Sequence, residues 1–178
     1  MSRRSGGELA AAAAYAALAV LVATGSAMFV LGLAVSAAFA AEWRVLHVFQ
    51  ALIYVALVVL ARQRSAWGYG AGFFVALFWN SLSLIVTTAA HDGIIELMSV
   101  LRTGNVQRPD VLLNLFATTG HFLVMLGCAI GMMQLRPRRA EWIRFAAGGV
   151  ICIAYLLTIV FAFGPPQAIE LMRRALHI

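Results

Sequence analysis

The chain has 178 residues, of which 63% are hydrophobic and only 11% are charged. A soluble domain carries about 25% charged residues, so this composition excludes an ordinary globular domain and a disordered chain. The formal net charge is +6, and all 13 basic residues are arginines that lie singly or in short clusters between apolar runs. This distribution favours lipid phosphates and membrane topology, and not nucleic acid, as the reason for the charge.

Five apolar runs approach or exceed the length of about 20 residues that a membrane span needs. The first lies within residues 8–40, and the others are residues 45–61, 67–90, 111–135 and 142–163. All four prolines lie outside these runs, which supports the boundaries because proline breaks helices. We therefore predict an all-α integral membrane protein, with one helical bundle of about five spans that covers residues 1–178.

The first run is longer than one span requires. As a helix its 33 residues measure about 50 Å, against a hydrocarbon core of about 30 Å. Either its Ala-rich start extends out of the membrane, or the chain turns back near Gly25-Ser26; two spans need about 40 residues, so one span is favoured. Arg3-Arg4, the apolar run and Ala38-Phe39-Ala40 also resemble a signal peptide, although the run is about twice too long. Cleavage would leave four spans in the same orientation.

The arginines predict the orientation of the bundle. With the N-terminus inside, eight arginines lie on the inner side and five on the outer side. The inner set is Arg3, Arg4, Arg62, Arg64, Arg136, Arg138, Arg139 and Arg144; the outer set is Arg44, Arg102, Arg108, Arg173 and Arg174. Because basic residues concentrate on the cytoplasmic side, we predict a cytoplasmic N-terminus and an outer C-terminus in a bacterial-type inner (plasma) membrane.

Two short amphipathic helices are expected outside the spans, on the outer or periplasmic side. Asp92 is positioned to cap a helix over residues 93–102 that ends at Gly104. A second helix, over residues 167–176, would begin after Pro165-Pro166. Each would lie either in the membrane interface or against the end of the bundle.

Polar side chains form stripes on the third and fourth spans, which run antiparallel. Asn80, Ser83 and Thr87 share one face of the third span, and Asn114, Thr118 and His121 share one face of the fourth. Asn80 lies ten residues from residue 90, and His121 lies ten residues from residue 111. The two stripes therefore match in depth, and we predict that Asn80 pairs with His121, Ser83 with Thr118 and Thr87 with Asn114.

The other spans add polar groups in their outer halves, whereas Met125, Cys128 and Met132 on the inner half favour packing. We thus predict a polar interior that opens to the outer side. It consists of His47, Gln50, Tyr54, Asn80, Ser83, Thr87, Asn114, Thr118, His121 and Tyr155. These groups either join helices or line a cavity, because hydrocarbon offers them no hydrogen-bond partner.

Three functions are compatible with this pattern. The first is a non-enzymatic accessory or assembly subunit of a membrane complex. The second is an outward-facing binding protein or channel for a small solute around Asn80 and His121. The third is a redox protein that holds haem b between His47 and His91, or a quinone at His121 and Tyr54.

The sequence does not favour an enzyme. The spans contain no paired carboxylates, no His–Asp pair and no HExxH motif, so no catalytic residue and no metal site are predicted. No cofactor is expected apart from the haem alternative. The expected partners are the lipid bilayer and either further copies of the chain or other membrane subunits, and not nucleic acid.

Overall fold

The computed structural model describes residues 6–178, with side chains from residue 12 onward. Arg3 and Arg4, which contribute to the predicted orientation, lie outside the described residues. The regular secondary structure of the described chain is entirely helical, with no strand. Its helices are α1 (Gly6–Phe39), α2 (Arg44–Arg62), α3 (Ala66–Ser81), α4 (Ala89–Thr103), α5 (Pro109–Gln134), α6 (Arg139–Phe163) and α7 (Pro166–Leu176), with a 3₁₀ turn η1 (Ala41–Trp43) and a π-helical turn η2 (Leu82–Val86).

Five of these segments are long and apolar enough to cross a membrane, which confirms the predicted all-α membrane bundle. They are Ala12–Phe39, Ala41–Arg62, Ala66–Val86, Pro109–Gln134 and Arg139–Phe163. Only 28–39% of the most apolar window of each segment is buried inside the protein. The remaining apolar side chains face outward, as they must where the surrounding solvent is hydrocarbon.

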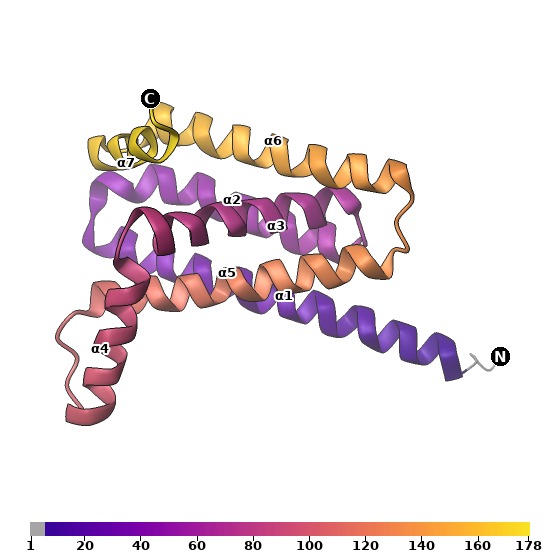
Figure 1. Ribbon diagram of the computed structural model, residues 1–178, viewed down its shortest axis with the longest axis horizontal. Helices are drawn as coiled ribbons and strands as arrows, with labels where there is room; N and C mark the ends of the chain where they lie inside the picture. The colour runs from indigo at the N-terminus through magenta and orange to yellow at the C-terminus, as the bar shows by residue number, and fades with distance from the viewer. Residues whose placement is uncertain (1–5) are drawn as a thin grey trace.

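The first span is a single helix, so the alternative of a hairpin near Gly25-Ser26 is wrong. Helix α1 has 34 residues and measures about 51 Å, and its amino-terminal part extends beyond the other helices (Figure 1). Gly25 does not break the helix but lets it approach α5. A Cβ atom added at Gly120 of α5 would lie only 2.7 Å from the carbonyl oxygen of Gly25. The backbones of α1 and α5 are therefore in contact at these two glycines.

The third span ends earlier than the predicted residue 90. Helix α3 passes into the π-helical turn η2, and Thr87 then has an extended backbone with φ −119° and ψ 166°. The Thr87 hydroxyl accepts a hydrogen bond from the Ala89 amide at 3.4 Å, which offers the backbone a local alternative to the helix. Because the polar stripe continues through this break at the same spacing, the sequence pattern alone did not reveal it.

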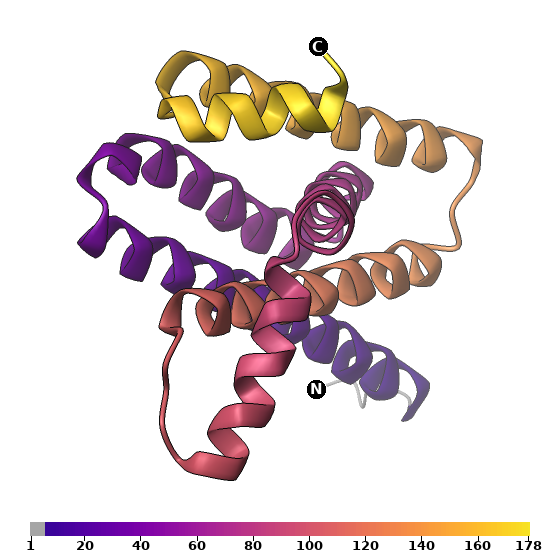
Figure 2. The same cartoon turned by 60° about the vertical axis from the view of Figure 1, so that its left-hand side comes forward.

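Figure 1 shows α4 and α7 at the same end of the bundle, opposite the amino terminus; we call this the α4/α7 end. Helix α7 packs on the bundle, and its Met172 is only 1% exposed. Helix α4 instead projects away across the direction of the spans (Figures 1 and 2), with Leu101 72% exposed. Each short helix was expected either in the membrane interface or against the end of the bundle, and α7 packs against the end of the bundle.

The predicted cap of α4 at Asp92 is wrong, because the helix begins at Ala89 and its N-cap residue is Thr88. Asp92 lies in the first turn, 3.6 Å from the guanidinium of Arg108. The predicted end of α4 is confirmed: Gly104 has a left-handed φ of 72°, which glycine adopts without strain.

A buried carboxylate holds α4 against the start of α5. Oε1 of Glu96 accepts hydrogen bonds from the backbone amides of Gln107 at 2.6 Å and Arg108 at 3.0 Å. These amides lie immediately before α5, and the amino-terminal end of that helix also favours a nearby negative charge. Glu96 therefore fixes the hairpin that joins α4 to α5.

Candidate functional site

A cluster of three hydrogen-bonded side chains links η2 and α5 near the α4/α7 end. Ser83 Oγ in η2 donates to Asn114 Oδ1 at 2.6 Å and lies 3.0 Å from Thr118 Oγ1. Thr118 Oγ1 lies 3.4 Å from Asn114 Oδ1, one turn away on the same helix. The predicted pairing of Ser83 with Thr118 is therefore present. The predicted pairing of Thr87 with Asn114 is wrong, because Thr87 donates to the Ser83 carbonyl oxygen.

The deep histidine has a different partner from the predicted one. His121 Nε2 lies 2.6 Å from the Tyr54 hydroxyl on α2, whereas Asn80 Nδ2 donates to the Met125 sulfur at 3.6 Å. The prediction that Asn80 pairs with His121 is thus wrong. Matched depth brings two side chains to one level of the bundle, but the rotation of each helix decides which neighbour each side chain meets.

Aromatic rings surround the Tyr54–His121 pair. The ring of Phe29 on α1 lies 4.2 Å from the His121 ring and 4.5 Å from the Tyr54 ring, between centroids. The Trp79 ring on α3 lies 6.2 Å from that of Phe29. His121 and Tyr54 are 2% and 1% exposed. Side chains from α1 and α2 therefore hold the imidazole ring of His121 in one position, and Trp79 of α3 packs behind Phe29.

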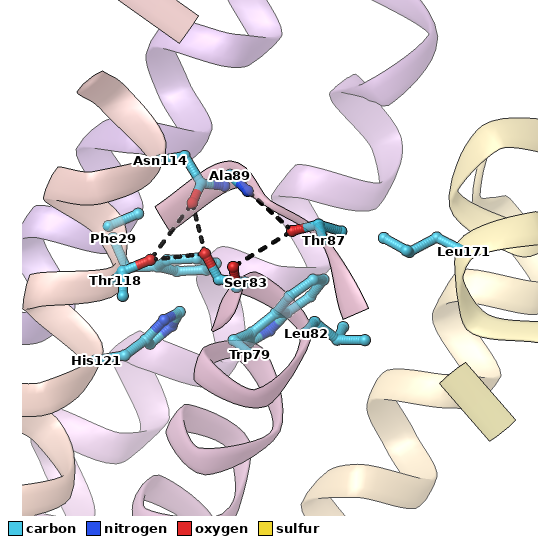
Figure 3. Close-up of a pocket in the computed structure, with 11 residues that line it drawn as sticks. Phe29, Trp79, Leu82, Ser83, Thr87, Ala89, Asn114, Thr118, His121 and Leu171 are labelled. Carbon is cyan, nitrogen blue, oxygen red and sulfur yellow. Dashed lines mark hydrogen bonds between the residues drawn. The ribbon is translucent and has the colours of Figure 1, made fainter. Parts of the chain in front are cut away.

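A cavity of about 180 Å³ lies between this aromatic group and the hydroxyl–amide cluster. Figure 3 shows the Asn114–Ser83–Thr118 network on one side of the cavity and His121 and Trp79 on the other. Leu171 of α7 and Ala89 of α4 border it from the α4/α7 end. The lining consists of Phe29, Trp79, Leu82, Ser83, Thr87, Ala89, Asn114, Ala117, Thr118, His121 and Leu171. None of these residues carries an acidic or a guanidinium group.

The structure brings five of the predicted interior residues to this cavity, namely Ser83, Thr87, Asn114, Thr118 and His121. Tyr54 reaches it only through His121. Asn80, Gln50 and His47 are buried but do not line the cavity. Each of these three has a buried polar atom with no hydrogen-bond partner among the described residues, as do Ser26 and Trp79. The polar character of the interior therefore extends from the cavity into the contacts between α1, α2 and α3.

One predicted interior residue and one predicted haem ligand lie elsewhere. Tyr155 is 39% exposed and borders an apolar surface groove with Leu52 and Trp67, so its assignment to the polar interior is wrong. His91 belongs to α4, where its side chain is 76% exposed and lies beside Asp92. It does not face inward as the haem alternative required, whereas His47 is buried with its ring 5.6 Å from that of Trp43.

The first span and α7 also contribute to the cavity, which the polar pattern of the sequence did not predict. Phe29 supplies the ring that covers His121, and Leu171 closes one side of the cavity. A sequence signal for Phe29 does exist, because it lies one helical turn beyond the Gly25-Ser26 pair and on the same face.

The fold places the protein in the class of polytopic α-helical membrane proteins with five spans. Comparisons with protein-family models, with curated proteins and with solved structures found no match.

Proposed function

We propose that this protein binds a small uncharged molecule in the cavity beside His121. One observation carries the proposal: a partly open cavity of about 180 Å³ is lined by aromatic faces and hydrogen-bonding groups, and by no acidic or guanidinium side chain. Sites for small molecules combine apolar walls with a few well-placed polar groups in this way. A neutral lining favours an uncharged ligand over an ion.

The packing on the side of His121 that is away from the α4/α7 end supports a binding site more than a channel. Beyond His121, α5 runs away from the α4/α7 end, and its side chains Val124, Cys128 and Met132 are each at most 1% exposed. These side chains form one cluster with Tyr69 and Ala76 of α3. A densely packed core of this kind leaves no continuous path for a solute, so the cavity opens toward one end only.

The competing proposal, an accessory or assembly subunit, loses part of its support. A subunit needs a free surface for its partner, and the glycines of the fourth span, residues 120, 127 and 131, would allow close contact with a neighbouring helix. In the structure Gly120 and Gly127 meet α1, and Gly131 meets the Tyr69 ring of α3. These close-approach surfaces are therefore occupied within the chain. A second polypeptide in stoichiometric amount, detected by native mass spectrometry after gentle extraction from the membrane, would favour the subunit.

A matched pair of variants tests the binding proposal. Thr118 lines the cavity, whereas its neighbour Thr119 is exposed on the outside of α5 and bonds the Leu115 carbonyl oxygen. Thr118→Leu adds a larger apolar side chain inside the cavity. Thr119→Leu adds the same side chain on the outside of α5, where it faces lipid. Binding of acetophenone to protein in lipid nanodiscs is measured by saturation-transfer NMR, with empty nanodiscs as the blank.

We expect acetophenone to bind the wild type and Thr119→Leu and to lose its signal in Thr118→Leu. A signal that is equal in both variants and in empty nanodiscs would show partition into lipid and refute the proposal.

We also propose that the protein lies in a bacterial-type inner membrane as a multi-pass protein, with the α4/α7 end outside. This proposal is supported by the distribution of the arginines.

A further inference from the structure

The hydrogen bond between Tyr54 and His121 determines where the histidine carries its proton. The Tyr54 hydroxyl is buried, and its only partner among the described residues is His121 Nε2 at 2.6 Å. A buried hydroxyl group needs an acceptor for its proton. Tyr54 therefore donates and Nε2 accepts. A neutral imidazole that accepts at one nitrogen is protonated at the other, so His121 has its N–H at Nδ1.

The Nδ1 group of His121 is free to serve a ligand. No hydrogen bond to it occurs among the described residues, although the ring borders the cavity. Among the uncharged side chains that line the cavity, the Nδ1–H group is a hydrogen-bond donor with a fixed direction, because Tyr54 and Phe29 hold the ring. The opposite tautomer would leave the Tyr54 proton buried without an acceptor.

The amide of Asn114 also presents a donor. Its distance of 2.6 Å to Ser83 Oγ is typical of an O–H···O bond and is short for an N–H···O bond. This length places Oδ1, and not Nδ2, against Ser83. The Thr118 hydroxyl has Asn114 Oδ1 and Ser83 Oγ within reach as acceptors. The hydroxyl protons are thus used inside the cluster, while the NH₂ group of Asn114 has no acceptor among the described residues.

From this arrangement we infer that the cavity selects a neutral ring that carries a carbonyl oxygen as hydrogen-bond acceptor. The inference rests on the proposed binding function and specifies its ligand class. His121 Nδ1–H and the Asn114 amide supply the donors, and Phe29 and Trp79 supply apolar faces for the ring. An apolar cavity of about 150 Å³ holds benzene, so about 180 Å³ suits one substituted ring. A free aromatic ketone and a quinone headgroup share this chemistry.

The test uses two probes of the same shape. Acetophenone has a carbonyl oxygen where α-methylstyrene has a methylene group, so the pair differs in the acceptor alone. We expect acetophenone to bind the protein in nanodiscs about tenfold more tightly, after subtraction of partition into empty nanodiscs. Duroquinone is the third probe. Tighter binding of duroquinone than of acetophenone assigns the site to quinone headgroups, and the reverse order assigns it to free aromatic ketones.

Tyr54 is a positioning residue in this scheme, and its variant tests the argument directly. Tyr54→Phe frees His121 to adopt either tautomer, which about halves the population that carries the Nδ1 proton, so the tenfold preference for acetophenone should fall to about fivefold or less. Tyr155→Phe removes a hydroxyl from the outer surface of α6 and should keep the full preference. A measurement on the wild type alone, ¹⁵N NMR of labelled histidine assigned with His121→Gln, should show the His121 proton on Nδ1.

The outcomes separate the two proposals. If none of the three probes binds, the proposed function itself fails. If α-methylstyrene binds as tightly as acetophenone, the cavity is a binding site but the inferred donor selectivity is overturned. A proton on Nε2 of His121 in the wild type overturns the inference even if Tyr54→Phe fails to fold.

Discussion

The contact between Gly120 and Gly25 makes a quantitative prediction for Gly120→Ala. The added Cβ would lie 2.7 Å from the Gly25 carbonyl oxygen and 2.9 Å from the Met28 Cβ. Neither atom can rotate away, because both are fixed to the α1 backbone, so the helices must move apart. Gly32→Ala at the same interface is the control, since its Cβ would meet Ala117 at an ordinary 3.7 Å.

Both substitutions gain about 1 kcal/mol of helix propensity, and this gain cancels when the two variants are compared. The remaining difference is the cost of overpacking, about 1–3 kcal/mol. We therefore expect Gly32→Ala to be as stable as the wild type or more stable, and Gly120→Ala to be about 1–3 kcal/mol less stable than Gly32→Ala.

Reversible unfolding with sodium dodecyl sulfate in mixed micelles, followed by far-UV circular dichroism, measures this difference. Because Gly120 precedes His121, the displacement should also weaken acetophenone binding. A Gly120→Ala protein as stable as Gly32→Ala would refute the close approach of α1 to α5.

Three further predictions concern the α4/α7 end and the orientation. Glu96→Ala should expose the backbone amides of Gln107 and Arg108, at a cost of about 1–3 kcal/mol in local stability, which hydrogen exchange of those amides measures; unchanged exchange would contradict the role of Glu96. If α4 lies in the membrane interface, a bimane label at Leu101→Cys should emit at shorter wavelength than one at Thr103→Cys in nanodiscs, and equal spectra would place α4 in water. A periplasm-active phosphatase fused after residue 178 should be active, whereas one inserted in the turn between α5 and α6 should be inactive; the opposite result would reverse the predicted orientation.

The membrane spans follow from the sequence because transfer of a segment into hydrocarbon depends mainly on its composition and length. The second span was predicted as residues 45–61, and its helix α2 is Arg44–Arg62 in the structure. The fourth, predicted as 111–135, is Pro109–Gln134. Proline at the first turn of α5 and glycine after α4 mark ends that the chemistry of the backbone requires. The end of the third span lacked such a marker, and its prediction was wrong.

Periodicity also placed Ser83, Thr118 and His121 on inward faces, because a helix of 3.6 residues per turn fixes which side chains share a face. The partners of these faces depend on helix order, rotation and distance, which are properties of the whole bundle. In the structure α5 packs between α1 and α3, so Phe29 covers His121, and Tyr54 of α2 displaces the expected Asn80. Close packing at glycines sets these rotations, and therefore only the tertiary structure determined which polar groups surround the cavity.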